Sequence, residues 1–312
     1  MMLLGLIPLV ASVLLARTSG SLSRRLSPRA AAPLLTLVAL ATSAATGVVL
    51  CLAAFGAVAQ LPFVAAVGGW SQSTWRPWDQ LSARWGIAAA AVAAGLLTGA
   101  CAYLVRVSRE LVQAHRACRG LAVGDDKLVI TRDEHPTAYA VSAGMGAIVV
   151  STGMLRLLSA GERRALLAHE ASHLRHHHAG YVLLAQLAAA ANPLLRPLAR
   201  SVRLSVELWA DQDAAAEVGD RRIVAQALAR ASLAVSRRGR RPAVTLAIAE
   251  TDVSVRVRAL TSRPPRLYPW AAAVVLVLAL ACGTTAVTLT WAMHQRIEIA
   301  QLAYAQAQVG AR

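Results

Sequence analysis

Long stretches without a charged residue constrain this chain more than any other feature of its sequence. A helix needs about 20 residues to cross a lipid bilayer, and three uncharged stretches reach that length, at residues 30–75, 85–105 and 267–295. A fourth stretch, Met1–Ala16, is shorter and is followed by basic residues. A cleavable signal peptide normally begins with basic residues, which this segment lacks. We therefore expect a retained first span, with a cleaved signal peptide as the alternative.

The longest stretch is too long for a single span. Pro62, Gly68 and Gly69 interrupt it, and both residue types disfavour the interior of a helix. We predict four transmembrane helices, at about residues 1–16, 34–59, 85–105 and 267–295. The expected fold is a mainly α membrane protein with a membrane region at 1–106, a domain at 107–266 between the third and fourth helices, and a short tail at 296–312.

The composition excludes several classes of protein. Charged residues make up 15% of the chain and apolar residues 56%, with a mean hydropathy of +0.50. Soluble domains are more highly charged and disordered chains are less apolar, so neither class fits. The four cysteines are too few for a disulfide framework.

The net charge of +16 is concentrated in two segments. Residues 17–29 contain four Arg and no acidic residue, and residues 106–266 contain 24 basic and 14 acidic residues. Basic loops of membrane proteins tend to face the cytoplasm. We therefore predict that the 107–266 domain is cytoplasmic and the tail extracellular. This explanation makes nucleic acid, the other common partner of basic domains, an unlikely partner.

The first part of the 107–266 segment predicts a small sheet followed by a helix. Short apolar, β-branched runs at 127–131, 137–141 and 147–151 lie between turn residues and are typical of strands. Ser159 and Glu162 then form the pattern of a capping box, in which each side chain satisfies a free backbone N–H at the start of a helix.

That helix contains the sequence His169-Glu170-Ala171-Ser172-His173. Residues four apart share one face of a helix, so both imidazoles can reach the same metal ion. Glu170 lies next to the first histidine, where it can hold a water for catalysis. The pattern predicts a catalytic zinc site, which usually takes three protein ligands.

The third ligand must come from elsewhere in the chain. The only carboxylates between 174 and 216 are Glu207, Asp211 and Asp213. Glu207 and Asp211 lie four apart, so one can bind the metal while the other orients a histidine ligand. The alternative is an acidic helix face exposed to solvent.

The segment from Asp125 to Leu233 resembles the membrane-embedded gluzincin zinc peptidases, namely the Bla/Mec receptor-type peptidases and, more distantly, the HtpX-type endopeptidases. The resemblance rests on the HExxH sequence followed about thirty residues later by Glu-x-x-x-Asp. It implies a zincin-like α+β metallopeptidase domain with one Zn²⁺ per chain. It also implies that His169, His173 and Glu207 bind zinc, that Glu170 is the general base, and that Asp211 supports the site.

The chain departs from the receptor-type peptidases at its sensor. Their penicillin-binding domain carries an S-x-x-K sequence, whereas Lys127 is the only lysine here and Gly124 precedes it by three positions. If the protein senses an external signal, the loop at 70–84 or a separate sensor protein must detect it.

Four further residues are candidates for contacts with the substrate. The residues that could contact the substrate or its transition state are His176, His177, His178 and Tyr139. His178 matches a histidine often found at this position in the family, although a solvated basic cluster is the alternative. The strand at 137–141 could bind an extended substrate by strand addition.

Two further segments of the 107–266 region have no place in the site. Residues 179–195 are apolar but short, so we expect a buried or membrane-dipping helix beside the site. The Arg-rich segment 236–241 is most simply a solvated loop, with attachment to anionic lipids as the alternative.

The sequence therefore predicts a membrane-integral zinc endopeptidase of the cell membrane whose active site faces the cytoplasm. Its expected partners are the lipid bilayer and a protein or peptide substrate, such as a cytoplasmic transcriptional repressor cleaved in regulated proteolysis. The alternatives are HtpX-like quality control of membrane proteins and a non-catalytic metal-binding scaffold. Glu170 argues against the scaffold, because a structural zinc site needs no base.

Overall fold

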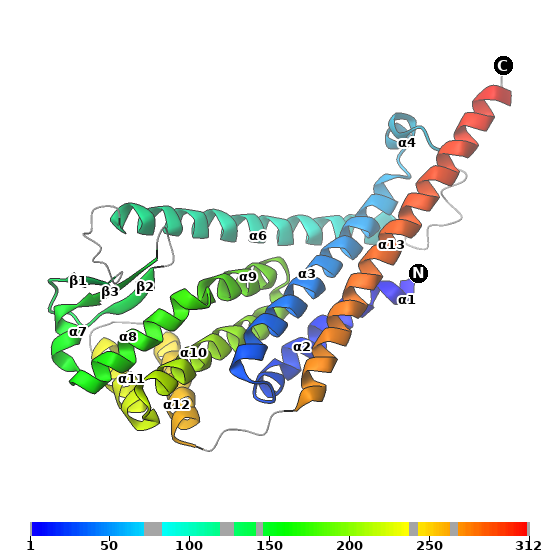
Figure 1. The fold of residues 1–312 in the computed structure, drawn as a ribbon. Helices are drawn as coiled ribbons and strands as arrows, with labels where there is room; N and C mark the ends of the chain where they lie inside the picture. The colour runs from blue at the N-terminus through cyan, green and yellow to red at the C-terminus, as the bar shows by residue number, and fades with distance from the viewer. Residues whose placement is uncertain are drawn as a thin grey trace.

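A computed structural model describes residues 2–71, 83–118, 128–141, 146–236, 243–262 and 268–310 (Figure 1). The Arg-rich segment beginning at Ser236 lies almost wholly outside these residues, as do Lys127 and most of the loop at 70–84. The helices are α1 (Met2–Gly5), α2 (Ile7–Ser23), α3 (Pro28–Val58), α4 (Pro62–Gly68), α6 (Ala83–Cys118), α7 (Thr152–Leu157), α8 (Ala160–Arg175), α9 (His178–Ala191), α10 (Arg196–Val218), α11 (Arg221–Ser236), α12 (Ala243–Thr261) and α13 (Pro269–Gly310).

Within the described residues, four helices are long and apolar enough to cross a membrane. These candidate spans are Leu3–Ser23, Pro28–Val58, Trp85–Gln113 and Pro269–Val309. These helices extend beyond the predicted spans, since α6 continues to Cys118 and α13 to Gly310. The predicted tail at 296–312 is thus helical as far as the structure describes it. Hydropathy marks only the apolar part of a helix, and polar helix-forming residues extend it into water.

The predicted break after the second span is present. Helix α4 ends at Gly68 and is followed by the C-cap residue Gly69, whose φ of 64° lies in the left-handed region that glycine adopts without strain. Trp70 then folds back, and its indole N–H donates to the carbonyl oxygen of Ala59 at 3.0 Å. It packs in a small apolar cluster with Ala65 and Ala300, which joins this turn to α13.

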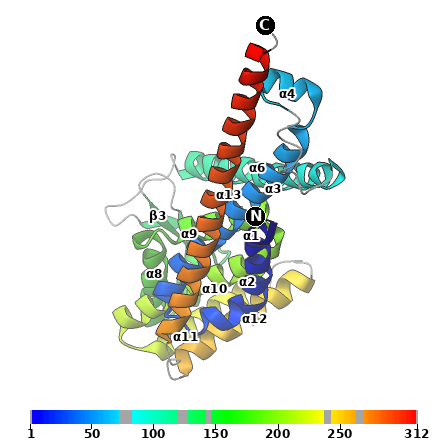
Figure 2. The same cartoon turned by 90° about the vertical axis from the view of Figure 1, so that its right-hand side faces the viewer.

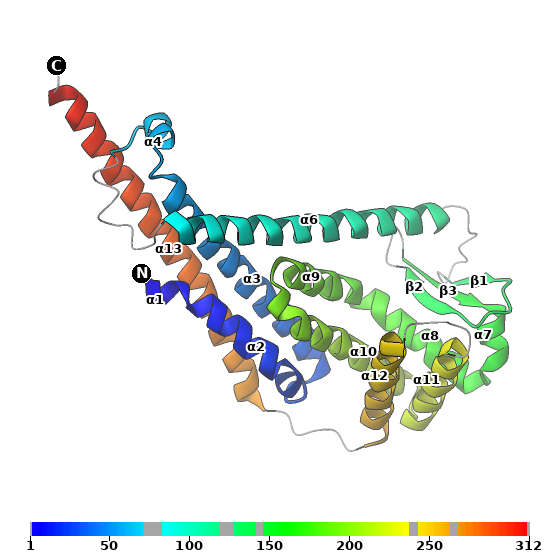
Figure 3. The same cartoon turned by 180° about the vertical axis from the view of Figure 1, so that it is seen from behind.

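The three predicted strands form one sheet, ordered β1 (Leu128–Thr131), β3 (Ala147–Ser151) and β2 (Ala138–Val141). Strand β3 lies in the middle, parallel to β1 and antiparallel to β2. β2 is therefore an edge strand, as expected. The sheet and helices α7, α8, α11 and α12 occupy the end of the molecule remote from the C-terminus (Figures 1 and 3).

Helices α9 and α10 form a hairpin, connected by the short 3-10 turn η2 (Pro193–Leu195), that packs against the candidate membrane helices α2, α3 and α6. At its tip the side-chain amide of Asn192 donates to the hydroxyl of Ser12 at 2.9 Å. The apolar core here combines Leu15, Leu35 and Val275 of the membrane helices with residues of α9 and α10. Helix α9 has 14 residues, which is short for a fifth span, and its buried residues are His178, Ala185, Ala188 and Ala189. Figure 2 shows α13 running the length of this bundle beside α3.

Candidate metal centre

The capping box at the start of α8 is formed as predicted. The backbone N–H of Ser159 donates to Glu162 Oε2 at 2.8 Å, and the Ser159 hydroxyl accepts from the backbone N–H of Glu162 at 3.4 Å. Arg230 of α11 also binds Glu162, at 2.8 Å. These contacts fix the start of the helix that carries both histidines.

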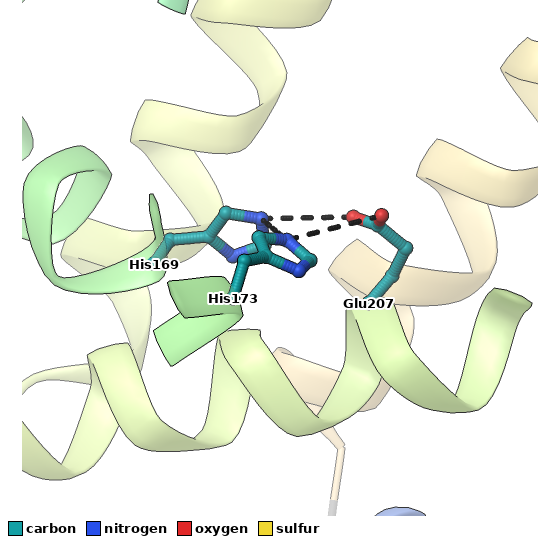
Figure 4. Close-up of side chains that lie close together, drawn as sticks. All are labelled: His169, His173 and Glu207. Carbon is teal, nitrogen blue, oxygen red and sulfur yellow. Dashed lines mark hydrogen bonds and ion pairs between the residues drawn. The ribbon is translucent and has the colours of Figure 1, made fainter. Parts of the chain in front are cut away.

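His169 and His173 project from adjacent turns of α8 toward Glu207 of α10 (Figure 4). Their Nε2 atoms are 3.1 Å apart. The Glu207 carboxylate lies 3.6 Å from the Nε2 of His169 and 3.9 Å from that of His173. Among the residues that the structure describes, His169, His173 and Glu207 could hold a metal ion, because their ligand atoms all lie within 4.8 Å of one another. We call these three residues the ligand group.

The spacing of these atoms fits a tetrahedral metal ion of the size of zinc. Zinc binds imidazole nitrogen at about 2.0–2.1 Å, so two nitrogens in a tetrahedral arrangement lie about 3.3 Å apart. The observed separation of 3.1 Å between the two Nε2 atoms is close to this value. Two imidazoles and one carboxylate also form the donor set of open catalytic zinc sites.

The other nitrogen of each ring has its own partner. His169 Nδ1 lies 3.0 Å from Asp211 Oδ1, and His173 Nδ1 lies 3.0 Å from His178 Nδ1. If both rings bind metal through Nε2, both Nδ1 atoms carry a hydrogen and donate it. His178 must then accept at Nδ1 and stay neutral. Burial and the neighbouring His173 lower the pKa of His178 to about 3, which keeps it neutral.

His178 and Tyr139, two of the four residues expected to contact the substrate, lie in different surroundings. His178 is completely buried, and its Nδ1 faces the Nδ1 of His173, the ring nitrogen that points away from the ligand group. Tyr139 is half exposed on the edge strand and lines the cleft at the site.

Arg256 of α12 is a member of the site that the sequence analysis missed. Its guanidinium donates to both oxygens of Asp211, at 2.8 and 2.7 Å, and lies 2.9 Å from Glu207 Oε2. It therefore fixes both carboxylates of the Glu-x-x-x-Asp pattern. One sequence offers no signal for this role, because Arg256 is one of 32 basic residues and lies 45 positions beyond Asp211.

Asp213, which the sequence left without a role, binds three side chains. It accepts from Ser172 of α8 at 2.7 Å and lies 3.0 Å from Nε2 of His176, the C-cap residue of that helix. It also accepts from Arg29 at the start of α3, at 2.7 Å. His176, another expected substrate contact, is thus held by Asp213.

The charged groups strongly perturb each other in the protein without metal. Burial alone would lower the pKa of His169, but hydrogen bonds to Asp211 and Glu207 outweigh it and raise the pKa to about 9. Burial and the charge on His169 lower the pKa of His173 to about 4. Burial alone would raise the pKa of Glu207, but His169 and Arg256 hold it well below its usual range. At neutral pH, His169 is therefore protonated and positively charged, whereas His173 is neutral and Glu207 is ionised.

Glu170 is buried between the ligand group and the edge strand. Burial raises its pKa above the usual range of a carboxyl, against the opposing charge of His169. Its carboxylate accepts the backbone N–H of Ala140 on β2. This contact places the acid between the histidines and the strand.

A cleft of about 1080 Å³ opens over the ligand group. Strand β2 and helix α8 form one side of it, and α11 and α12 form the other, with side chains such as Leu228 and Val257. Apart from the charged residues near the histidines, its walls are mostly apolar, so it suits an extended peptide with apolar side chains.

Searches of curated proteins and of solved structures found no significant match to the chain. Residues 104–264 match Peptidase family M48. The matched segment covers more than half of the chain and contains β1 to β3, the HExxH helix, Glu207 and Arg256. It agrees with the resemblance to zinc metallopeptidases of the Bla/Mec and HtpX type. The chain therefore belongs to Peptidase family M48, a family of metallopeptidases.

Proposed function

We propose that this protein is a membrane-integral zinc endopeptidase of the gluzincin type, with its active site on the cytoplasmic side. The convergence of His169, His173 and Glu207 beside the buried Glu170 carries this proposal. The net positive charge of residues 17–29 and 106–266 supports the orientation.

The residues around the ligand group have distinct roles in the proposed reaction. When bound, zinc would lower the pKa of a water molecule toward about 7 and polarise the carbonyl of the peptide bond. Glu170 takes a proton from that water and passes it to the departing amine, and its raised pKa suits a group that must both accept and donate. Asp211 and His178 position the two histidines, and Arg256 positions Glu207.

The substrate is proposed to bind as an additional strand along β2. Thr137 accepts a backbone hydrogen bond from Ser151, and hydrogen-bonded pairs alternate along an antiparallel ladder. The backbone N–H and C=O groups of Tyr139 and Val141 therefore point toward β3, whereas those of Ala138 and Ala140 point toward the cleft. The bond from Ala140 to Glu170 agrees with this alternation. A substrate must be extended to bind in this way, which favours flexible segments of proteins.

We further propose that the substrate is a cytoplasmic regulator, such as a transcriptional repressor, which is inactivated by cleavage. This part of the proposal rests on the resemblance to the receptor-type peptidases. A cleft that takes extended chain on the cytoplasmic side is consistent with it.

The experiment compares the wild type with Glu170→Gln, in membranes of cells that produce either protein. We expect both to bind one zinc, and the variant to cleave cellular proteins at least about 100-fold more slowly because the general base is lost. Glu217→Gln is the matched control, since Glu217 is an exposed acid on α10. Identical cleavage products from the wild type and Glu170→Gln would refute the proposed peptidase activity. Products consisting only of misfolded membrane proteins would refute the regulator as substrate.

A further inference from the structure

Asp213 connects the metal-binding helix to a membrane helix. Its side chain is 7% exposed, and both of its oxygens are used. Oδ2 binds Ser172 in the last turn of α8 and His176, the C-cap residue of that helix, and Oδ1 binds Arg29. One buried carboxylate thus contacts the C-terminal end of α8 and the first turn of α3.

Arg29 occupies an unusual position for a basic residue. It lies in the first turn of α3, directly after the N-cap residue Ser27 and Pro28. The N-terminus of a helix carries a partial positive charge, so a cation there is unfavourable without a partner. Asp213 supplies that partner at 2.7 Å. The same turn of α3 also packs on α10, where Ala32 contacts the cluster of Val206 and Trp209.

A continuous series of contacts leads from Asp213 to the metal ligand His173. The ring of His176 stacks on Trp209, with centroids 4.6 Å apart. Trp209 in turn lies against His178, with centroids 4.7 Å apart, and His178 binds Nδ1 of His173. Ser172, the second partner of Asp213 on α8, directly precedes His173.

We propose that Asp213 is a positioning residue through which transmembrane helix α3 determines the geometry of the metal site. When Arg29 is docked, Asp213 holds α8 where His169 and His173 face Glu207. When α3 moves relative to α10, the Arg29 contact breaks, and the Asp213 carboxylate that binds Ser172 and His176 loses the partner that fixes its position. The inference rests on the proposed metal site, and it gives the membrane helices a role in controlling activity.

The turn before α3 is also tied to the last membrane helix. The backbone N–H of Tyr268 donates to the carbonyl oxygen of Arg25 at 3.0 Å. The Arg25 guanidinium lies over the ring of Trp270, 4.9 Å from its centroid. A displacement of α13 therefore moves the turn that carries Arg29, so a signal received on the extracellular side has a mechanical route to the metal site.

The test uses the full-length protein in lipid nanodiscs and substitutes Arg29. Arg29 is 62% exposed, so Arg29→Gln should fold. Substitution of residues that contact metal ligands typically weakens metal binding about 10- to 100-fold. Arg29 contacts no metal ligand directly and acts through Asp213, so its effect should be smaller. We expect Arg29→Gln to weaken zinc binding by about 3- to 10-fold and to shift the visible absorption band of the Co²⁺-loaded protein. We also expect kcat to fall with KM unchanged, because Arg29 does not line the cleft.

Two further variants distinguish positioning from general stability. Arg29→Lys keeps the charge and should restore most of the affinity. Arg24→Gln removes an exposed arginine from the same turn and should leave both metal readouts unchanged. If Arg29→Gln lowers the melting temperature but has the same cobalt spectrum and the same zinc affinity as the wild type, the proposal is refuted. The metal readouts need no substrate, so they decide the question even if the wild type cleaves nothing.

Discussion

Zinc binding to the free protein should release one proton, and the pKa of His169 determines the pH range. At pH 7 the metal-free ligand group carries that proton, because the pKa of His169 is about 9 and that of His173 about 4. Zinc must displace the proton to bind Nε2. The apparent affinity at pH 7 is then about 100-fold below its maximum, which corresponds to about 2.7 kcal/mol.

The affinity should therefore rise about tenfold per pH unit between pH 6 and 8, and level off near pH 9. Competition with a fluorescent chelator measures the slope. Calorimetry in buffers of different ionisation enthalpy counts the released protons, for which we expect about one per zinc at pH 7. Asp211→Asn removes the partner that raises the pKa of His169, so its affinity should level off at a lower pH. His294→Gln alters a histidine far from the ligand group and serves as the control. A flat affinity between pH 6 and 8, or no proton release, would refute the assignment of the proton to His169.

The same pKa makes the stability of the metal-free protein depend on pH. The folded-state pKa of His169, about 9, lies above its ordinary value of 6.5. The contribution of His169 to the free energy of unfolding is therefore fully present below pH 6.5 and is lost as the pH rises to 9. The difference between the two pKa values corresponds to about 3 kcal/mol. Zinc-loaded protein should not show this loss, because the metal has already displaced the proton, and melting temperatures measured with and without zinc provide the comparison.

Three other substitutions test the site and the fold. Arg256→Gln breaks a buried ion-pair network and should lower the free energy of unfolding of the metal-free protein by about 3 kcal/mol, whereas the exposed Arg258→Gln should change it by less than about 0.5 kcal/mol; thermal unfolding in detergent measures both. Ala138→Pro removes a backbone N–H that faces the cleft, so it should raise KM for a peptide substrate while zinc content stays at one per chain, and an unchanged KM would argue against strand addition. Gly153→Ala places its new Cβ 2.0 Å from a backbone carbonyl oxygen and should destabilise by about 1–3 kcal/mol, in contrast to Gly180→Ala in α9, where the Cβ meets nothing within 4 Å and stability should hold or increase.

The elements that the sequence predicts best are those that depend on local patterns. A capping box, an i, i+4 pair of histidines and a short β-branched run each specify a structure over a few residues, and all are present. The positions of helix ends depend less on such local patterns. The end of α13 lies beyond the predicted span, because the residues there are polar but still favour a helix.

The contacts around the metal ligands could be predicted only in part. Glu207 and Asp211 share a helix face, so their proximity follows from spacing, and the structure brings both to the histidines. Arg256 and Arg29 reach the same network from segments 45 and 184 positions away from their carboxylate partners. Nothing in a single sequence distinguishes these two arginines from the other basic residues, because their pairing depends on the packing of whole helices.

Packing also explains why the membrane helices cannot be regarded as a simple anchor. The sequence suggests a boundary at residue 107, but the apolar core around Leu35 continues from α2, α3 and α13 into α9 and α10. Glu207 lies on α10, about one and a half turns after Val202, the last of the α10 residues in that core. An isolated 107–266 fragment would expose this face of α9 and α10 to water. The position of the third metal ligand therefore depends on the same apolar contacts that hold the membrane helices together.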